Sequence, residues 1–144
     1  MAAKQDFTEQ EWASLERGIS GTGLLVSLAD RDFTDTFGEV SAMAKYLAGQ
    51  QVAASSELLR ELAKSHNPGF GLTSSAEKVR SETLEAVKTS VALLSAKSPD
   101  DVEGYKALVL GVAQAVADAK GGGSSAVETQ TIDAVREALG ATPA

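Results

Sequence analysis

The sequence contains no cysteine, and aromatic residues make up only 5% of it. Without cysteine the chain can form no disulfide bond, no thiolate metal site and no cysteine nucleophile, and this favours a reducing compartment such as the cytoplasm. The first residues lack the apolar stretch of a signal peptide, and no window approaches the roughly 18 apolar residues of a membrane span. We therefore expect a soluble, cytoplasmic protein without membrane insertion.

Positive charge is also scarce, with 13 Lys and Arg residues against 20 Asp and Glu residues and a formal net charge of −7. The basic residues are scattered singly along the chain, whereas affinity for nucleic acid depends on clustered cations that neutralise phosphates. We expect no binding to nucleic acid. Strand patterns are absent too, because no segment alternates polar and apolar residues over a useful length.

Helix signals, in contrast, are frequent. Thr8 to Glu11 forms a capping box between Phe7 and Trp12, which predicts a helix that starts at Glu9. Further helix starts follow at Ser74, Ser98 and Ser125, and apolar residues recur at helical spacing after each of them. The sequence predicts an all-α bundle of about six helices, in a single domain over residues 1–144 with short tails at 1–7 and 141–144.

Glycine affects the expected helix boundaries. Gly18, Gly21 and Gly23 lie within the first expected helix, where they predict a kink or, in our preferred interpretation, close approach of another helix. The second expected helix ends near Gly49, and its apolar face is Phe37, Val40, Met43, Ala44 and Leu47. A third helix begins at Ser55 or Ser56, unless the alanine-rich link makes it continuous with the second.

One pattern occurs twice in the chain. An apolar helical run ends in Asp30 or Asp118, a short turn follows, and a second helical run opens with Glu39 or Glu128. This predicts two similar helix-turn-helix units, one near each end of the chain. If the four carboxylates converge across the turns, they are suitable ligands for Ca²⁺ or Mg²⁺. The alternative is that each glutamate stabilises only the positive end of its own helix.

Other candidate residues lie in the segment that follows the third expected helix. Phe70 stands among glycines and is a candidate contact for a partner protein, although it could also fold back against the bundle. His66 is the only histidine, and no serine occurs in a Gly-x-Ser-x-Gly elbow. Because no nucleophile and base occur in a recognisable arrangement, we expect a protein that is not an enzyme.

The runs 25–30 and 112–118, each followed by a turn, an acid and another helix, resemble the tellurite-resistance TerB-like helical domains. The resemblance implies an all-α fold and a connection with stress responses and metal-sensing complexes at membranes. It places acidic family positions at Asp30, Glu39, Asp118 and Glu128, although Arg31 stands where that family usually has glycine. Segments 6–12 and 113–140 are also similar to a family of small bacterial helical proteins that carries no established activity.

The sequence therefore leads to one main hypothesis and two alternatives. The main hypothesis is a non-enzymatic helical domain of a stress-response system that binds a partner protein through an alanine-rich face or the Phe70 segment. The first alternative is a domain that binds a divalent cation at the two acidic corners. The second is binding of a small ligand in a cavity between helices.

Overall fold

The computed structural model describes residues 4–29, 36–53, 56–64, 76–118 and 126–140. Over these residues there is no strand, and the α-helices are α1 (Glu9–Ala29), α2 (Thr36–Ala53), α3 (Glu57–Ala63), α4 (Ala76–Lys97), α5 (Val102–Asp118) and α6 (Ala126–Ala138). Two short 3₁₀ helices, η1 (Lys4–Asp6) and η3 (Pro99–Asp101), precede α1 and α5. The prediction of an all-α bundle of about six helices is confirmed.

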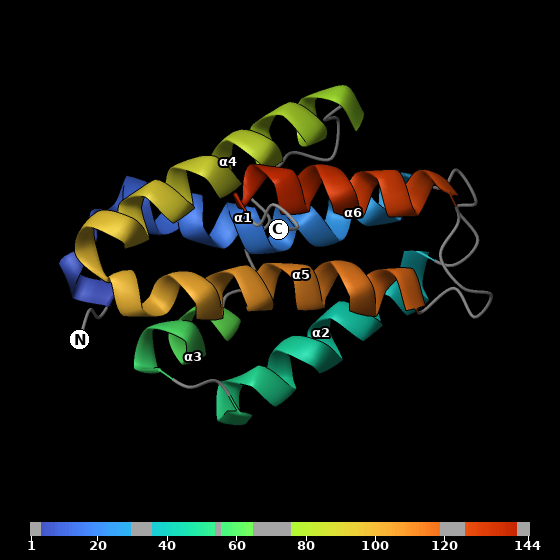
Figure 1. Cartoon of the computed structure of the whole chain (residues 1–144). Coiled ribbons are helices and arrows are strands. Elements are labelled where there is room, and N and C mark those ends of the chain that lie inside the picture. Colours follow the sequence, from blue (N-terminus) through green and yellow to red (C-terminus); the bar gives the residue numbers. More distant parts are fainter. Residues whose placement is uncertain (1–3, 30–35, 54–55, 65–75, 119–125, 141–144) are drawn as a thin grey trace.

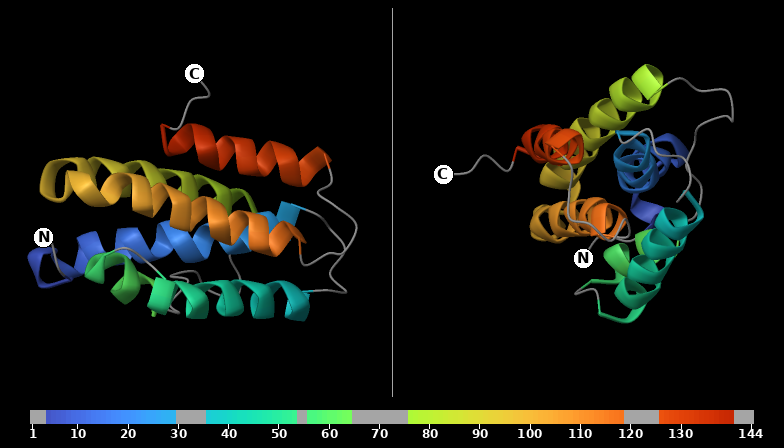
Figure 2. Two further views of the ribbon diagram at one scale, coloured as in Figure 1. Left: turned by 60° about the horizontal axis from the view of Figure 1, so that its bottom comes forward. Right: turned by 90° about the vertical axis from the view of Figure 1, so that its right-hand side faces the viewer.

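Four helices form the body of the bundle. Each of α1, α4, α5 and α6 contacts the other three, and Figure 2 shows them end-on around a common centre. α2 and α3 lie together on one side of this body, mainly against α5 (Figure 1). α2 is therefore an outer helix that contacts α5, α3 and α1 on its inner side.

Local signals in the sequence set the helix starts as expected. The Thr8 hydroxyl accepts the Glu11 N–H at 3.1 Å and the Glu11 carboxylate accepts the Thr8 N–H at 2.8 Å, so the capping box is complete. The rings of Phe7 and Trp12 lie 6.1 Å apart across it. Ser56 is the N-cap of α3 and accepts a hydrogen bond from the Leu59 N–H, so α2 and α3 are separate helices.

The core lies between α1, α4, α5 and α6 and extends to α2 and α3, and Tyr105 is its largest fully buried side chain. The Tyr105 hydroxyl donates a hydrogen bond to the carbonyl oxygen of Leu15 at 2.9 Å, which satisfies the only polar group of the side chain. Burial raises the pKa of this hydroxyl well above its ordinary value. The surrounding core includes Leu15, Ile19, Val87, Leu94, Val109, Val112, Val135 and Leu139.

The glycines of α1 allow close packing, as we expected from the sequence. α1 runs without a break through Gly18 and Gly23. A methyl group at Gly18 would meet the Tyr105 hydroxyl, and one at Gly23 would meet the Met43 sulfur and, at 3.2 Å, a methyl of Val112. The interpretation as a site of close helix approach is confirmed at both positions.

Two expectations for α2 are wrong. The helix does not end near Gly49 but continues to Ala53, and the side-chain amide of Gln51 in its last turn donates to the Ala63 carbonyl oxygen at 3.4 Å. Ala44, expected on the apolar inner face, is exposed. Met43 and Leu47 lie on the inner face as expected, together with Tyr46 and half-buried glutamines. The side chains of Phe37 and Val40 are not among those described.

Among the described helices, none combines the length and the apolar character that crossing a bilayer requires.

Candidate functional site

The acidic residues that the sequence singled out are only partly described. Asp30 lies outside the described residues. Glu39 and Glu128 lie in the first turns of α2 and α6, but their side chains are not among those described. Asp118 ends α5, where its exposed carboxylate accepts a hydrogen bond from the Gln114 side-chain amide at 2.8 Å. The predicted Ca²⁺ or Mg²⁺ site therefore stays a prediction, and the described part of the chain contains no group of three or more potential metal ligands.

The other candidate residues and the two predicted turns are not described by the structure. Phe70 and His66 lie outside the described residues. The turns of the two helix-turn-helix units, residues 30–35 and 119–125, do so as well. The predicted similarity of these two corners, and the contact of Phe70 with a partner, stay predictions.

One polar cluster joins the N-terminal end of the chain to α4. The Lys97 ammonium donates to Glu11 Oε1 at 2.8 Å and to the Asp6 carbonyl oxygen at 3.1 Å, and it lies 5.2 Å from the centre of the Phe7 ring. The hydrogen bond from Lys97, followed by that from the Thr8 amide, lowers the pKa of Glu11. Because these partners all belong to the chain itself, we interpret the cluster of Asp6, Phe7, Glu11 and Lys97 as a structural contact between α1 and α4, which we call the clasp.

A groove of about 380 Å³ runs between α1 and α4. Its lining is mostly polar and consists of Ser14, Arg17, Ser81, Glu82, Glu85, Ala86 and Thr89. Small-ligand sites are usually concave and mostly apolar with a few convergent polar groups, whereas Ala86 is the one apolar residue that lines this groove. The prediction of a ligand cavity between helices gains no support from it.

The outward side of α2 is less polar than the Lys97 cluster and the groove between α1 and α4. From Met43 to Val52, its exposed residues are Ala44, Lys45, Ala48, Gly49 and Val52, which we call the α2 outer face. Val52 is 86% exposed and is the one large hydrophobic residue exposed in the described part of the chain. The α2 outer face thus combines small apolar residues and a single charge.

The inner side of α2 holds the helix firmly in place. Leu47 is completely buried, and Tyr46 lies over Gly111 of α5, where a methyl group would overlap the phenol ring. Partial burial of this phenol raises the pKa of Tyr46. Because these contacts fix the rotation of α2 about its axis, the α2 outer face is turned away from the bundle.

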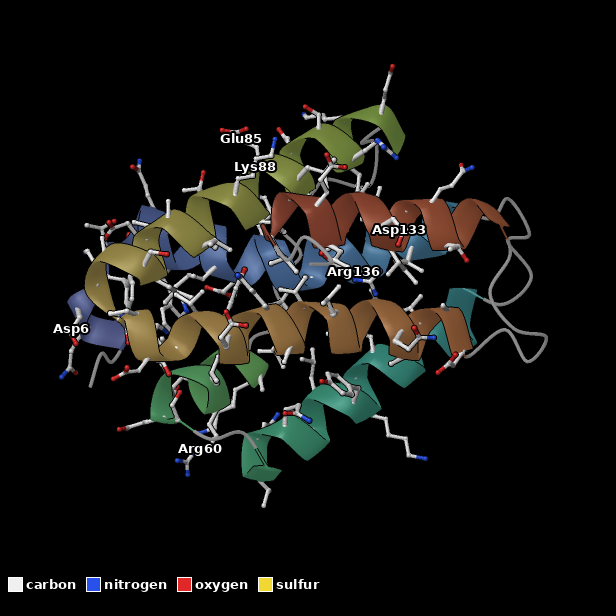
Figure 3. The ribbon with its side chains drawn as sticks, viewed as in Figure 1. Asp6, Arg60, Glu85, Lys88, Asp133 and Arg136 are labelled. Carbon is white, nitrogen blue, oxygen red and sulfur yellow. The ribbon has the colours of Figure 1, made fainter. Side chains whose placement is uncertain are left out.

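The outward sides of other helices carry more charge. On α4 they include Glu77, Lys78, Arg80, Glu85 and Lys88, and on α6 they include Asp133 and Glu137. Figure 3 shows Glu85 and Lys88 on α4, away from the side on which α2 lies. Surface helices normally show such polar outer sides, so an apolar one marks α2 as a candidate binding surface.

Sequence reasoning missed most of this surface. An alanine-rich face for a partner was expected, but Ala44 was assigned to the core and Gly49 to a helix end. The signal that could have found the face is the near absence of charge, since Lys45 is the only charged residue from Val40 to Ala53. A helix that is apolar on every side is usually buried, so one at the edge of a bundle leaves an uncovered face.

Comparison of the chain with protein-family models, with curated proteins and with solved structures finds no match.

Proposed function

We propose that the chain is a non-enzymatic helical module that binds a partner protein, and that the partner packs on the α2 outer face. Ala44, Ala48 and Val52 are spaced by four residues and so form one stripe along the helix. Covering Val52 alone contributes roughly 1.5 kcal/mol from the hydrophobic effect, because this side chain is almost fully in water. From the resemblance to TerB-like domains we infer a setting in a stress response.

The observation that carries this proposal is Gly49. A Cβ atom built at Gly49 meets no atom within 4 Å. Glycine inside a helix destabilises it by roughly 0.5–1 kcal/mol relative to alanine. At Gly18, Gly104 and Gly111 a neighbouring side chain occupies the space that a methyl group would need, which explains these glycines.

Nothing in the described residues gives such a reason for Gly49. A partner whose backbone approaches α2 closely would supply one, because glycine and alanine let two helices come near each other. The composition of the face also limits the chemistry of the partner. Its contact surface should be apolar and largely uncharged, since a charged group buried against Ala48 would lose its hydration without gaining a partner.

A photo-crosslinking amino acid at position 48 tests this proposal. In an extract of the source cells, we expect residue 48 to form discrete adducts with a protein, which mass spectrometry then identifies. Position 92 on α4, also an exposed alanine, is the matched control. Adducts of equal yield at the two positions, or none specific to position 48, would count against the α2 outer face as a binding surface.

A further inference from the structure

We propose that α2 and α3 form an arm that opens as one unit from the other four helices, which stay assembled, and that this opening uncovers an apolar face on α5 and α1. We call these two helices the α2–α3 arm, and we call α1, α4, α5 and α6 the body. The inference goes beyond the proposed function and does not depend on it, because it concerns the inner side of α2 and not the α2 outer face.

The body is closed without the arm. Each of its four helices contacts the other three, whereas α2 and α3 have their main contacts with α5, with α1 and with each other. Figures 1 and 2 show both arm helices on one side of the body. Hydrogen bonds between distant parts of the chain lie within the body: Tyr105 of α5 donates to Leu15 of α1, and Lys97 of α4 donates to Glu11 of α1. Opening of the arm would break neither of them.

The arm, in contrast, is attached to the body by apolar packing. Over residues 43–52 and 56–64, whose side chains the structure describes, no hydrogen bond or ion pair reaches a body helix. The polar contacts of these residues stay inside the arm, where the Gln51 amide donates to the Ala63 carbonyl oxygen at 3.4 Å and ties the end of α2 to α3. The polar contacts thus divide the fold into two units, and cooperative opening often follows such helix pairs.

The face of α5 that the arm covers is shaped by two glycines. Gly104 and Gly111 are about two turns apart and therefore lie on the same side of α5. Leu59 of α3 occupies the space in which a side chain at Gly104 would lie, and Tyr46 of α2 occupies that space at Gly111. Each glycine is thus a socket in the body for one side chain of the arm.

A third socket lies on α1. The nearest neighbour of a Cβ atom built at Gly23 is the sulfur of Met43 on α2. Glycine inside a helix lowers the stability of that helix, so the body contains three weakened positions whose closest neighbours belong to the arm. Because these contacts are apolar, they set the position of the closed arm without a hydrogen bond that opening would have to break.

Buried leucines keep the closed arrangement dominant. Leu47 of α2 and Leu58 and Leu62 of α3 are completely buried, and opening would bring part of this apolar area into water. The open arrangement is therefore a minor state, and the closed one still fixes the orientation of α2. Exchange of the backbone amides that the minor state exposes can detect it.

Native-state hydrogen exchange of the full chain, followed residue by residue by NMR, tests the inference. We expect the hydrogen-bonded amides of α2 and α3 to share protection factors at least about tenfold below those of the body, which corresponds to about 1.4 kcal/mol. Low concentrations of urea should lower the protection of the arm cooperatively, because opening exposes apolar surface. Equal protection and equal urea dependence in arm and body would overturn the inference.

Two glycine variants distinguish opening of the arm from global unfolding. Gly18→Ala introduces a clash with Tyr105 that lies inside the body and persists when the arm opens. It should therefore lower the protection of the body and leave that of the arm unchanged. Tyr105→Phe, which removes the hydrogen bond to Leu15, is a milder body variant with the same expected pattern. Gly111→Ala is the matched variant, because its clash is with Tyr46 of the arm, and it should lower the protection of both units. If the two body variants lower the protection of arm and body by the same factor, the arm opens only by global unfolding.

A disulfide between α1 and α2 supplies a test that does not weaken the fold. The natural chain has no cysteine, and a Cβ atom built at Gly23 lies 3.5 Å from Met43 Cγ, so Gly23→Cys and Met43→Cys can be bridged. Oxidation should raise the protection of the arm toward that of the body, and reduction should restore the difference. A difference that is the same in both forms would contradict opening at this socket. Crosslinking at residue 48 measures binding and exchange measures opening, so either proposal can fail alone.

Discussion

The Lys97 ammonium at the end of α4 lies 2.8 Å from the Glu11 carboxylate near the start of α1. The two residues are 86 positions apart in the sequence, so their contact closes one end of the bundle. Each has other neighbours in the same place: Lys97 donates to the Asp6 carbonyl oxygen, and Glu11 completes the capping box with Thr8. The clasp therefore couples a helix start to a long-range contact.

This clasp predicts a specific dependence of stability on pH. The pKa of Glu11 is lowered in the folded chain from its ordinary value of 4.5, chiefly by the hydrogen bond from Lys97. A lowered folded-state pKa means that the stabilisation is complete above pH 4.5 and is lost as the pH falls through the folded-state pKa. We expect Glu11→Gln to lower the free energy of unfolding at pH 7, and the difference from the natural chain to shrink in acid.

Urea unfolding followed by Trp12 fluorescence measures this difference, since Trp12 is the only tryptophan and packs beside the clasp. Glu85→Gln, on the exposed side of α4, is the matched control and should alter stability little. A deficit of Glu11→Gln that stays constant from pH 7 to about pH 3, where a free glutamate is protonated, would show that the clasp acts only through packing.

The pair Gly18 and Tyr105 predicts a measurable coupling. A methyl group at Gly18 would meet the Tyr105 hydroxyl, whereas the next ring atom is 3.5 Å away. Overpacking of this kind typically costs about 1–3 kcal/mol, so Gly18→Ala should destabilise the fold. Tyr105→Phe removes the hydroxyl and its hydrogen bond to Leu15. In the double variant we expect less destabilisation than the sum of the single effects, as a double-mutant cycle would measure.

A contrasting cycle is available at Gly111 and Tyr46. There a methyl group would overlap not only the hydroxyl but also the ring carbons of Tyr46, one of them at 2.9 Å. Removing the hydroxyl leaves those carbons in place, so Tyr46→Phe should not rescue Gly111→Ala. Rescue of the same size in both cycles would mean that α2 shifts freely against α5. That result would contradict the fixed orientation on which the α2 outer face depends.

The starts and contacts of α1 and α2 show how much of this fold the sequence could predict. The capping box at Thr8 fixed the start of α1 because its hydrogen bonds are local, and Gly18 suggested close packing because a helix-interior glycine needs a reason. The sequence misassigned Ala44 and Gly49 for a physical cause. Alanine fits both a core and a surface, so its spacing does not reveal which way α2 is turned. That orientation depends on the long-range contacts of Tyr46 and Leu47.

Tyr105 predicts a loss of stability in alkaline solution. Burial disfavours its charged form and raises its pKa in the folded chain far above the ordinary value of 10.0. A raised folded-state pKa means that the associated stabilisation is present below pH 10 and is lost as the pH rises above it, when the unfolded chain ionises. We expect the free energy of unfolding to fall above pH 10 less steeply in Tyr105→Phe. Urea unfolding at about pH 9 and about pH 11 measures this fall on either side of the pKa of free tyrosine, which is about 10. An equal fall in the free energy of unfolding in Tyr105→Phe and in the natural chain would contradict the prediction.

Gly49→Ala separates folding from binding, because the two effects have opposite signs. With nothing within 4 Å of the added methyl group, the isolated chain should gain about 0.5–1 kcal/mol of helix stability. With a partner packed on the α2 outer face, the same methyl group would keep the partner's backbone away, so binding should weaken. Thermal unfolding of the isolated chain measures the first effect, and the yield of partner adducts at residue 48 measures the second. Ala92→Gly on α4 is the reverse control and should lower stability without a change in binding. If Gly49→Ala destabilises the monomer, α2 contacts a part of its own chain at that position, and the α2 outer face is not free to bind.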